Sequence, residues 1–311
     1  MADKATREAY GDALAELGEQ YDMVVLDADL SKSTKTDTFK KKFPERFINC
    51  GIAEGNMMSI AAGIAATGKL VFASSFAMFA AGRAFEQVRN SIGYTRLPVK
   101  IGATHAGLSV GEDGATHQCN EDIATMRVIP NMTVVVPADY ISTKALVKAA
   151  AKFDGPVYLR MGRLAVPNLY KEDASFEIGK AVELFPGSDA TIIAAGLMLH
   201  EAVQARELLA ADGISVRIID MHTIKPIDKE IIVKAARETG AIVTAEEHSV
   251  IGGLGSAVSE VVCEHMPCPV IKVGVEDRFG KSGEARSVLK LFGLSAENIA
   301  EKVKAAIDLK K

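Results

Sequence analysis

Residues 105–118, HAGLSVGEDGATHQ, combine the residue types that bind hydroxyl groups and move protons. The segment contains two histidines, an acid pair at Glu112 and Asp113, and three glycines, with few apolar side chains to bury. Polar loops of this length inside a compact domain are more often functional than passive. Imidazole groups can transfer protons and contact a developing oxyanion. The alternative is a solvated surface loop whose glycines permit tight turns.

A single carboxylate, Glu54, stands at the start of a helix-like run of small and apolar residues, 49–68. A charge in such surroundings is costly to remove from water unless it has a partner or a task. The simple explanation is a first-turn glutamate that the helix dipole favours. The functional explanation is an acid that takes part in catalysis. Glu54 taken alone favours the simple explanation.

Two phenylalanines, Phe76 and Phe79, lie three residues apart just after a strand-like run. This spacing is typical of side chains that pack on one face of a helix. It also suits two rings that offer a flat apolar surface to a planar ligand. Their spacing alone favours ordinary core packing.

These residues must be positioned by a sheet, because short β-rich runs alternate with helical patterns along the chain. In the first half we expect strands at 23–26, 47–50, 70–73, 99–102, 134–136 and 157–159, and helices at 7–19, 55–66, 80–92 and 142–152. Ligands of open α/β sheets gather at the carboxyl ends of the strands. The polar loops follow strands of the first half, so we expect the chemistry there.

The second half repeats the same alternation of strands and helices. We expect strands at 191–194, 216–219, 242–245 and 270–273, and helices at 200–211, 229–238 and 256–265. Residues 162–187 between the halves contain Pro167, Pro186 and a mixed-charge stretch without a helical period, so the boundary is expected near 175–186. The expected fold is α/β with two doubly wound domains, one over residues 1–175 and one over 186–311.

Composition and charge exclude several classes of function. The 311 residues are 48% hydrophobic and 24% charged, with a net charge of -4, as in ordinary globular proteins without a basic surface for nucleic acid. No apolar run reaches the roughly 20 residues that span a bilayer. The polar N-terminal residues do not look like a signal peptide, so a cytoplasmic location is expected. The four cysteines are scattered, without metal-ligand spacing, so no metal site is expected on this chain.

Several motifs in order along nearly the whole chain resemble transketolase. They are GIAE at 51–54, SSFAMF at 74–79, THAGLSVGEDGATHQ at 104–118, PAD at 137–139, MGR at 161–163 and TIKPID at 223–228. The match corresponds to the C-terminal two-thirds of a full-length enzyme, a pyrimidine-binding domain followed by the transketolase C-terminal domain. The resemblance implies reversible transfer of a two-carbon ketol unit from a ketose phosphate to an aldose phosphate, with thiamine diphosphate as cofactor.

The resemblance implies cofactor-binding roles for four residues. Glu54 matches the glutamate that hydrogen-bonds the pyrimidine ring nitrogen of thiamine diphosphate and gives it a proton. Phe79 looks like the aromatic residue that stacks on the pyrimidine, with Phe76 beside it. Asp29 lies where family members approach the cofactor from the neighbouring subunit, although Asp-Leu-Ser after a strand is also a common turn.

Substrate contacts follow from the same resemblance. His105 and His117 resemble the histidines that contact the keto and hydroxyl groups of the donor sugar, and thus count as catalytic along with Glu54. Asp113 resembles the acid that reads the configuration of the sugar's C2 hydroxyl. Three residues fall where the family binds the sugar phosphate: Arg7, Ser33 and Arg163. Arg160, three residues before Arg163, remains an alternative to it as the phosphate ligand, and an exposed salt bridge remains the alternative role for Arg7.

The chain lacks the GDG sequence and following asparagine with which the family holds the cofactor's diphosphate through a divalent metal. We therefore expect a second polypeptide, an N-terminal transketolase subunit that carries the diphosphate-binding domain and binds Mg²⁺, Ca²⁺ or Mn²⁺. The expected complex is a heterotetramer of two copies of each chain. The motifs leave open which ketose and aldose phosphates are used.

Three alternatives share the expected fold. The β subunit of 2-oxo acid dehydrogenases has a similar length and domain pair, but normally lacks the loop sequence of 105–118. Deoxyxylulose phosphate synthase usually carries its diphosphate domain on the same chain. A regulatory or scaffold subunit would have no physical need to keep all of Glu54, Phe79, His105, Asp113 and His117.

Overall fold

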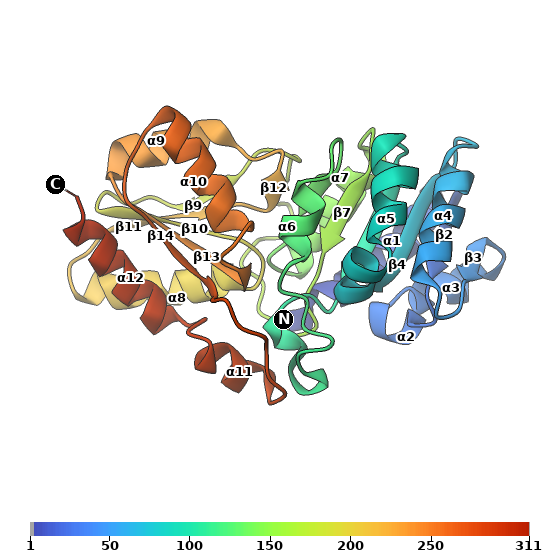
Figure 1. Ribbon diagram of the computed structural model, residues 1–311, viewed down its shortest axis with the longest axis horizontal. Coiled ribbons are helices and arrows are strands. Elements are labelled where there is room, and N and C mark those ends of the chain that lie inside the picture. Colours follow the sequence, from blue (N-terminus) through green and yellow to red (C-terminus); the bar gives the residue numbers. More distant parts are fainter. Residues whose placement is uncertain (1–2, 311) are drawn as a thin grey trace.

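A seven-stranded sheet in the first half brings the ends of the expected strands together. The computed structural model describes residues 3–310 (Figure 1). The strand order is β12-β6-β7-β5-β4-β2-β3, parallel throughout except that β12 runs antiparallel to β6. The strands are β2 (Met23–Asp27), β3 (Phe47–Asn49), β4 (Leu70–Phe76), β5 (Val99–Thr104), β6 (Thr133–Val135), β7 (Val157–Arg160) and β12 (Thr223–Lys225).

Helices cover both faces of this sheet, which explains why its strands are nearly continuous apolar runs. Side chains of α1 (Thr6–Gln20), α3 (Asp37–Lys42) and α7 (Tyr140–Lys152) form one buried cluster with the strands. Side chains of α4 (Glu54–Ala65), α6 (Asp122–Arg127) and the segment from Met78 to Tyr94 form the cluster on the other face.

The second half forms a five-stranded sheet of order β14-β13-β10-β11-β9, in which only β9 is antiparallel to its neighbour. Its strands are β9 (Val182–Phe185), β10 (Ala190–Ala194), β11 (Val216–Asp220), β13 (Ile242–Ser249) and β14 (Val270–Val275). One face carries α8 (Met198–Ala211) and α12 (Ala296–Asp308), and the other carries α9 (Lys229–Thr239) and α10 (Leu254–His265) (Figure 1).

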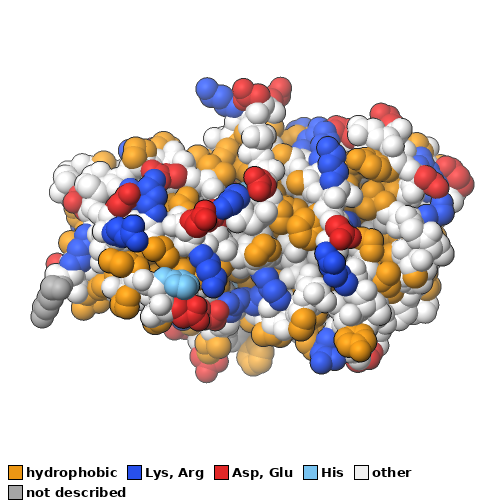
Figure 2. Space-filling view, turned by 90° about the horizontal axis from the view of Figure 1, so that it is seen from above, with side chains coloured by type: hydrophobic (Ala, Val, Ile, Leu, Met, Phe, Trp, Pro, Cys, Tyr) orange, Lys and Arg blue, Asp and Glu red, His pale blue; other side chains and the backbone are white. Residues whose placement is uncertain are grey.

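The remaining elements are short. A two-stranded ladder joins β1 (Lys4–Ala5) to β8 (Ala165–Val166). The others are α2 (Ser31–Thr34), η1 (Pro44–Arg46), η4 (Leu108–Asp113) and α11 (Ala285–Leu291). Among the helices within residues 3–310, none is long and apolar enough to cross a membrane. On the face shown in Figure 2, positive and negative side chains are interspersed.

The expected α/β class is confirmed, and the expected strands and most of the expected helices are present. Several strands run past their expected ends, and β4, β5 and β13 do so by two to four residues, into polar residues that are nevertheless buried. In β13 these residues are Glu246, Glu247 and His248. Hydrogen bonds, rather than apolar side chains, keep these residues buried in the strand. Their sequence therefore lacks the apolar pattern from which a buried strand is predicted.

The helix expected at 80–92 is irregular. It divides into η2 (Met78–Arg83) and η3 (Val88–Tyr94), both π-helical, joined by a short α5 (Phe85–Gln87). A π-helical turn contains more residues than an α-helical turn and frequently lies at a functional site. The irregularity therefore changes which side chains of this segment lie together, a change that helical periodicity could not predict.

The two halves share secondary structure across the expected boundary. Strand β9 lies within the boundary segment 175–186 and belongs to the second sheet. Strand β12, which comes from the second half, completes the first sheet by pairing with β6. The buried cluster on the α4 side also continues into α9 and α10.

Candidate active site

The candidate residues meet at the carboxyl end of the first sheet. Glu54 begins α4 after β3, Phe76 ends β4, and His105 directly follows β5. Arg163 follows β7, and Arg7 lies in the first turn of α1. Parallel strands place their carboxyl ends at one edge of a sheet, so residues distant in sequence converge there.

Glu54 is buried, with only 1% of its side chain exposed. Its Oε2 accepts a hydrogen bond from Nη1 of Arg83 at 2.8 Å, and its Oε1 lies 3.4 Å from the donating Oγ of Ser75. Arg83 is half-exposed, and its guanidinium carbon lies 4.5 Å from the centre of the Phe79 ring. The carboxylate thus has one strong partner, and that partner is a surface side chain.

Four rings form an aromatic cluster beside this ion pair. Phe76 and Phe79 lie nearly parallel with centroids 5.9 Å apart, and the imidazole of His105 stacks on Phe76 at 3.9 Å. The ring of His117 meets Phe79 edge-on at 5.4 Å. The phenylalanines therefore contact both loop histidines instead of packing only among core residues.

His105 is neutral, because burial first and the nearby charges of Arg7 and Arg163 next lower its pKa to about 3. Its Nε2 lies 3.4 Å from Nη1 of Arg7, which can only donate, so Nε2 carries no proton. Nδ1 then carries the proton and donates to Oγ1 of Thr104 at 2.9 Å. His105 thereby presents an unprotonated nitrogen toward the cationic side of the site.

A rim of cationic side chains surrounds His105. Nη1 of Arg7 donates to the backbone oxygen of Ser33 at 2.9 Å, while its Nε is buried with no hydrogen-bond partner among the described residues. Arg163 donates to the backbone oxygen of Val110 and to the carboxylate of Glu112, and is partly exposed. Lys35 also lies close enough to lower the pKa of His105, although its effect is smaller than that of the two arginines.

Arg160 is not available to a ligand at this rim. Its Nε donates to Asp122 at 2.9 and 3.1 Å, and its Nη2 donates to the backbone oxygens of Glu247 and Cys119 at 2.8 and 3.3 Å. Both Arg160 and Asp122 are buried. Arg160 therefore joins the two halves of the molecule internally, and Arg163 is the arginine of this segment that faces outward.

The loop with the two histidines is held from the second half of the molecule. The Ser109 backbone N–H donates to Oε1 of Glu247. Gly107, at φ +79°, packs so closely on Glu247 that a Cβ would lie 2.4 Å from its carboxyl carbon. The glycine is thus required by packing as well as by its backbone conformation.

Two predicted residues lie at the periphery. Asp113 is exposed at the end of η4. Asp29, at φ +63°, is also exposed, and it exchanges two hydrogen bonds with Asn49, at 2.9 and 3.1 Å. Neither aspartate is hydrogen-bonded to Glu54 or to the histidines.

Two residues of the site were not predicted, Arg83 and Lys35. Arg83 lies beside Phe79 on η2 and is bonded to Glu54 of α4, and apolar periodicity does not reveal this contact between the two elements. Lys35 adopts a positive φ of 70° at the end of α2, a helix too short to be predicted from pattern. A basic residue four positions after an aromatic residue was the one available sequence signal for Arg83.

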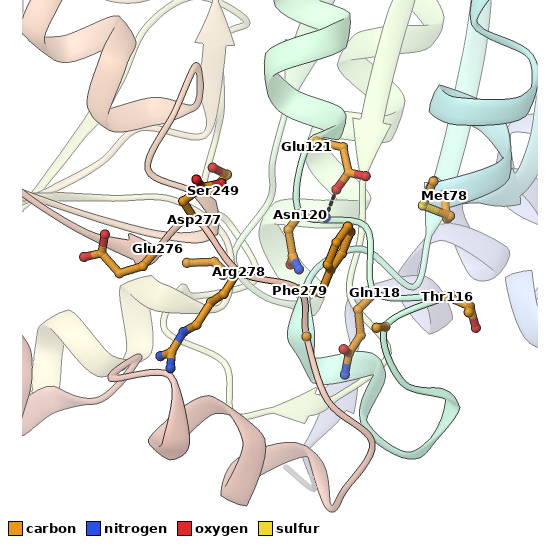
Figure 3. A pocket seen from close by; sticks show the side chains of 13 residues that line it. Met78, Thr116, Gln118, Asn120, Glu121, Ser249, Glu276, Asp277, Arg278 and Phe279 are labelled. Atoms are coloured by element: carbon orange, nitrogen blue, oxygen red, sulfur yellow. Dashed lines mark hydrogen bonds between the residues drawn. The ribbon is translucent and has the colours of Figure 1, made fainter.

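A separate cavity of about 360 Å³ lies where the two halves meet (Figure 3). Gln118 and Asn120 line it from the first half, and Arg278 and Phe279 line it from the second. None of the predicted site residues lines it. Elsewhere within residues 3–310, no three His, Cys, Asp or Glu side chains are grouped so that they could hold a metal ion.

Comparison with known proteins gives two domain matches that together cover most of the chain. Residues 2–168 match the family model "Transketolase, pyrimidine binding domain" and residues 179–299 match "Transketolase, C-terminal domain". A "Putative transketolase C-terminal section" of Methanocaldococcus jannaschii is 53% identical over 96% of this chain and 95% of its own length.

Other relatives differ in how much of their own length is matched. The human protein named transketolase is 40% identical over 99% of this chain but only 50% of its own length. A solved structure described as "Split gene transketolase, inactive beta4 tetramer" has a TM-score of 0.93 and 56% identity, with 99% of both chains covered.

Proposed function

The chain belongs to the transketolase family, and from that premise we propose that it is the subunit of a split transketolase that carries the pyrimidine-binding and C-terminal domains. The reaction is the reversible transfer of a two-carbon ketol unit from a ketose phosphate to an aldose phosphate. The observation that carries this proposal is the convergence of a buried glutamate, two stacked phenylalanines and a cationic rim at one sheet edge.

The residues present fit the pyrimidine ring of thiamine diphosphate. The ring is planar and has polar nitrogens at its edge, so it needs a flat apolar surface and a hydrogen-bonding carboxyl group side by side. Phe76 and Phe79 offer that surface, and the Glu54 carboxyl lies beside them with a single strong and displaceable partner. When bound, the cofactor supplies the nucleophilic carbon and takes up the electrons of the broken carbon–carbon bond.

In this proposal Glu54 hydrogen-bonds the pyrimidine ring nitrogen and shares a proton with it. A carboxyl group in a buried site can act in this way, since little water competes for the hydrogen bond. Phe79 stacks on the ring and Phe76 supports it. Asp29, exposed at the carboxyl end of β2, approaches the cofactor bound at a neighbouring subunit.

The histidines act on the sugar. The unprotonated Nε2 of His105 accepts a hydrogen bond from a substrate hydroxyl group, and its low pKa keeps the imidazole neutral across the physiological range. His117 is partly exposed and its Nδ1 lies 2.9 Å from Oγ1 of Thr116, so the ring is oriented, while Nε2 has no hydrogen-bond partner among residues 3–310 and is available to a substrate oxygen. Asp113, on the same loop, reads the configuration of the C2 hydroxyl group.

Arg7, Ser33 and Arg163 bind the sugar phosphate. Guanidinium groups suit phosphate because their donors are forked and permanently charged. The buried Nε of Arg7, which has no partner among the described residues, is a donor available to such an anion. The surrounding cations also favour a phosphorylated substrate over a neutral one.

The diphosphate part of the cofactor is bound by a second polypeptide. The chain matches half of the human relative's length, and it lacks the GDG sequence that the family resemblance associates with the diphosphate site. We propose that an N-terminal transketolase subunit provides the diphosphate site with its divalent metal, Mg²⁺, Ca²⁺ or Mn²⁺, and that two copies of each chain form a heterotetramer.

The test is turnover of the purified chain, alone and after addition of its N-terminal partner, with a ketose phosphate and an aldose phosphate as substrates. We expect ketol transfer only in the mixture with thiamine diphosphate and a divalent metal. Transfer by this chain alone would refute the split arrangement. Decarboxylation of pyruvate without ketol transfer would instead support a 2-oxo acid dehydrogenase subunit.

A further inference from the structure

Arg83 holds both groups that the proposed function assigns to the pyrimidine ring. Its Nη1 donates to Oε2 of Glu54 at 2.8 Å. Its guanidinium carbon lies 4.5 Å from the centre of the Phe79 ring, within the range of a cation–π contact. The side chain is therefore bonded to the proposed proton donor and lies against the proposed stacking surface at the same time.

A guanidinium group and an aminopyrimidine make similar demands on a binding site. Both are planar, both present N–H donors at their edge, and both are stabilised by an aromatic face and a carboxylate. We propose that Arg83 is a placeholder: it occupies the pyrimidine site of the cofactor-free chain and swings out when thiamine diphosphate binds. This inference rests on the proposed function, because it takes the assignment of Glu54 and Phe79 from there.

The energetics explain why such a placeholder is useful. A carboxylate as buried as Glu54 is costly without a partner, and apart from Arg83 its one hydrogen bond among the described residues is the long one from Ser75. The Arg83 side chain neutralises that cost while the site is empty. Once a ring nitrogen takes its place, Glu54 no longer needs the guanidinium.

The same residue is easily displaced. Half of its side chain is exposed, and within residues 3–310 its guanidinium has no hydrogen-bond acceptor other than Glu54. The released cation is well hydrated, because half of its side chain already faces water. Arg83 and Phe79 lie on the same segment, η2, so rotation of the Arg83 side chain frees both groups without unfolding the segment.

The test compares thiamine diphosphate binding by the reconstituted complex with Arg83→Met and with Arg83→Lys, measured calorimetrically in the presence of Mg²⁺. Arg89→Met is the matched control, because Arg89 is exposed on η3 and bonded to Asn90. We expect Arg83→Met to lower the Kd for thiamine diphosphate about tenfold. We expect Arg83→Lys to lie between it and the wild type, and the control to match the wild type.

Thermal unfolding provides the second readout. A placeholder stabilises only the empty site, so Arg83→Met lowers the Tm of the cofactor-free complex and leaves the Tm of the loaded complex unchanged. Equal loss in both forms with an unchanged Kd would show a merely structural ion pair, and weaker binding would show that Arg83 contacts the cofactor. Either result overturns the inference. Failure of the wild-type complex to bind thiamine diphosphate would instead overturn the proposed function.

Discussion

Buried carboxylates lie at the carboxyl ends of both sheets, but their partners are of different kinds. Glu54, after β3 in the first sheet, is bonded to the half-exposed side chain of Arg83. Glu246, near the end of β13 in the second sheet, accepts from the backbone N–H groups of Leu254 and Gly255 at 2.6 and 2.8 Å. The first carboxylate has a partner that can leave, and the second is fixed to the start of α10.

The contrast shows that burial alone does not identify a functional acid. Burial raises the pKa of Glu246 and of Glu247 to about 7, yet the hydrogen-bond partners of both are part of the backbone framework. Structural networks can shift a pKa as strongly as active sites do. The exchangeable partner, together with the aromatic surface beside it, distinguishes Glu54.

The sharpest test of this contrast is Glu54→Gln. We expect it to lower ketol transfer by the reconstituted complex by about 10⁴-fold, at the upper end of the range for loss of a proton-transferring group, with little change in stability. Steady-state assays of the complex measure the effect. Glu86→Gln, an exposed change on α5, is the control. If the Glu54 variant keeps most of its activity, the assignment of this acid is wrong.

Arg160→Met, unlike Glu54→Gln, is expected to lower the stability of the chain. Asp122 would be left buried without its cation, and breaking such a pair costs about 3–5 kcal/mol of the free energy of unfolding. Urea denaturation of the purified chain measures this loss. The exposed Arg237 provides the control variant, Arg237→Met, for which no loss is expected. A fully stable Arg160→Met chain with impaired sugar-phosphate binding would reverse the roles given to Arg160 and Arg163.

The buried structural acid Glu247 should also make the stability of the protein depend on pH. The native state keeps the Glu247 proton up to a pKa of about 7, above the ordinary 4.5, so its contribution to stability is present below pH 4.5 and lost as pH rises through 7. Glu247→Gln removes this loss. The free energy of unfolding of the Glu247→Gln variant, relative to that of the wild type, should therefore rise by roughly 3 kcal/mol between pH 4.5 and pH 8.

Urea midpoints at several pH values measure this difference. The exposed Glu207→Gln serves as the control and should show no such trend. A difference between Glu247→Gln and wild type that stays constant with pH would mean that the native carboxyl group titrates as it does in the unfolded chain.

The smallest expected effect concerns the outward-facing arginine. Arg163→Met should raise the KM for a sugar phosphate about 30-fold, or about 2 kcal/mol, with kcat nearly unchanged, since one charge-assisted contact to phosphate is lost. Kinetics with phosphorylated and unphosphorylated sugars measure it, and only the phosphorylated substrate should respond. Arg96→Met, which breaks an exposed ion pair, is the control. An unchanged KM would remove Arg163 from the phosphate site.

Much of the fold follows from the sequence, because alternating apolar runs and helical patterns reflect the burial of parallel strands on both faces. The polar ends of β4 and β13 were not predicted, since Ser74, Ser75, Glu247 and His248 are buried and hydrogen-bonded to residues distant in sequence. Strand β12 was also not predicted, for a related reason. It is three residues long, and its partner strand lies about ninety residues earlier.

Prediction of the site was limited by geometry more than by chemistry. The motifs identify Glu54, Phe79 and the two histidines, and the structure brings them to one edge of the sheet. Arg160 and Arg163 have the same side chain and lie three residues apart, so the sequence does not distinguish them. Their neighbours in the structure show that Arg160 is internal and Arg163 faces outward. Arg83 was not predicted because an arginine four residues after a phenylalanine is an ordinary neighbouring pair on a helix and does not by itself indicate a site.

Strand β12 determines where this chain can be cut. A fragment that stopped at residue 175 would contain every residue of the candidate site but would leave one side of β6 unpaired at the sheet edge. Exposed edges of this kind are templates for association with other chains. The fragment would also expose the part of the core that α9 and α10 normally cover. Dissection of the two domains is therefore expected to yield aggregation, whereas a fragment that retains residues 223–225 at the edge of β6 would be protected there.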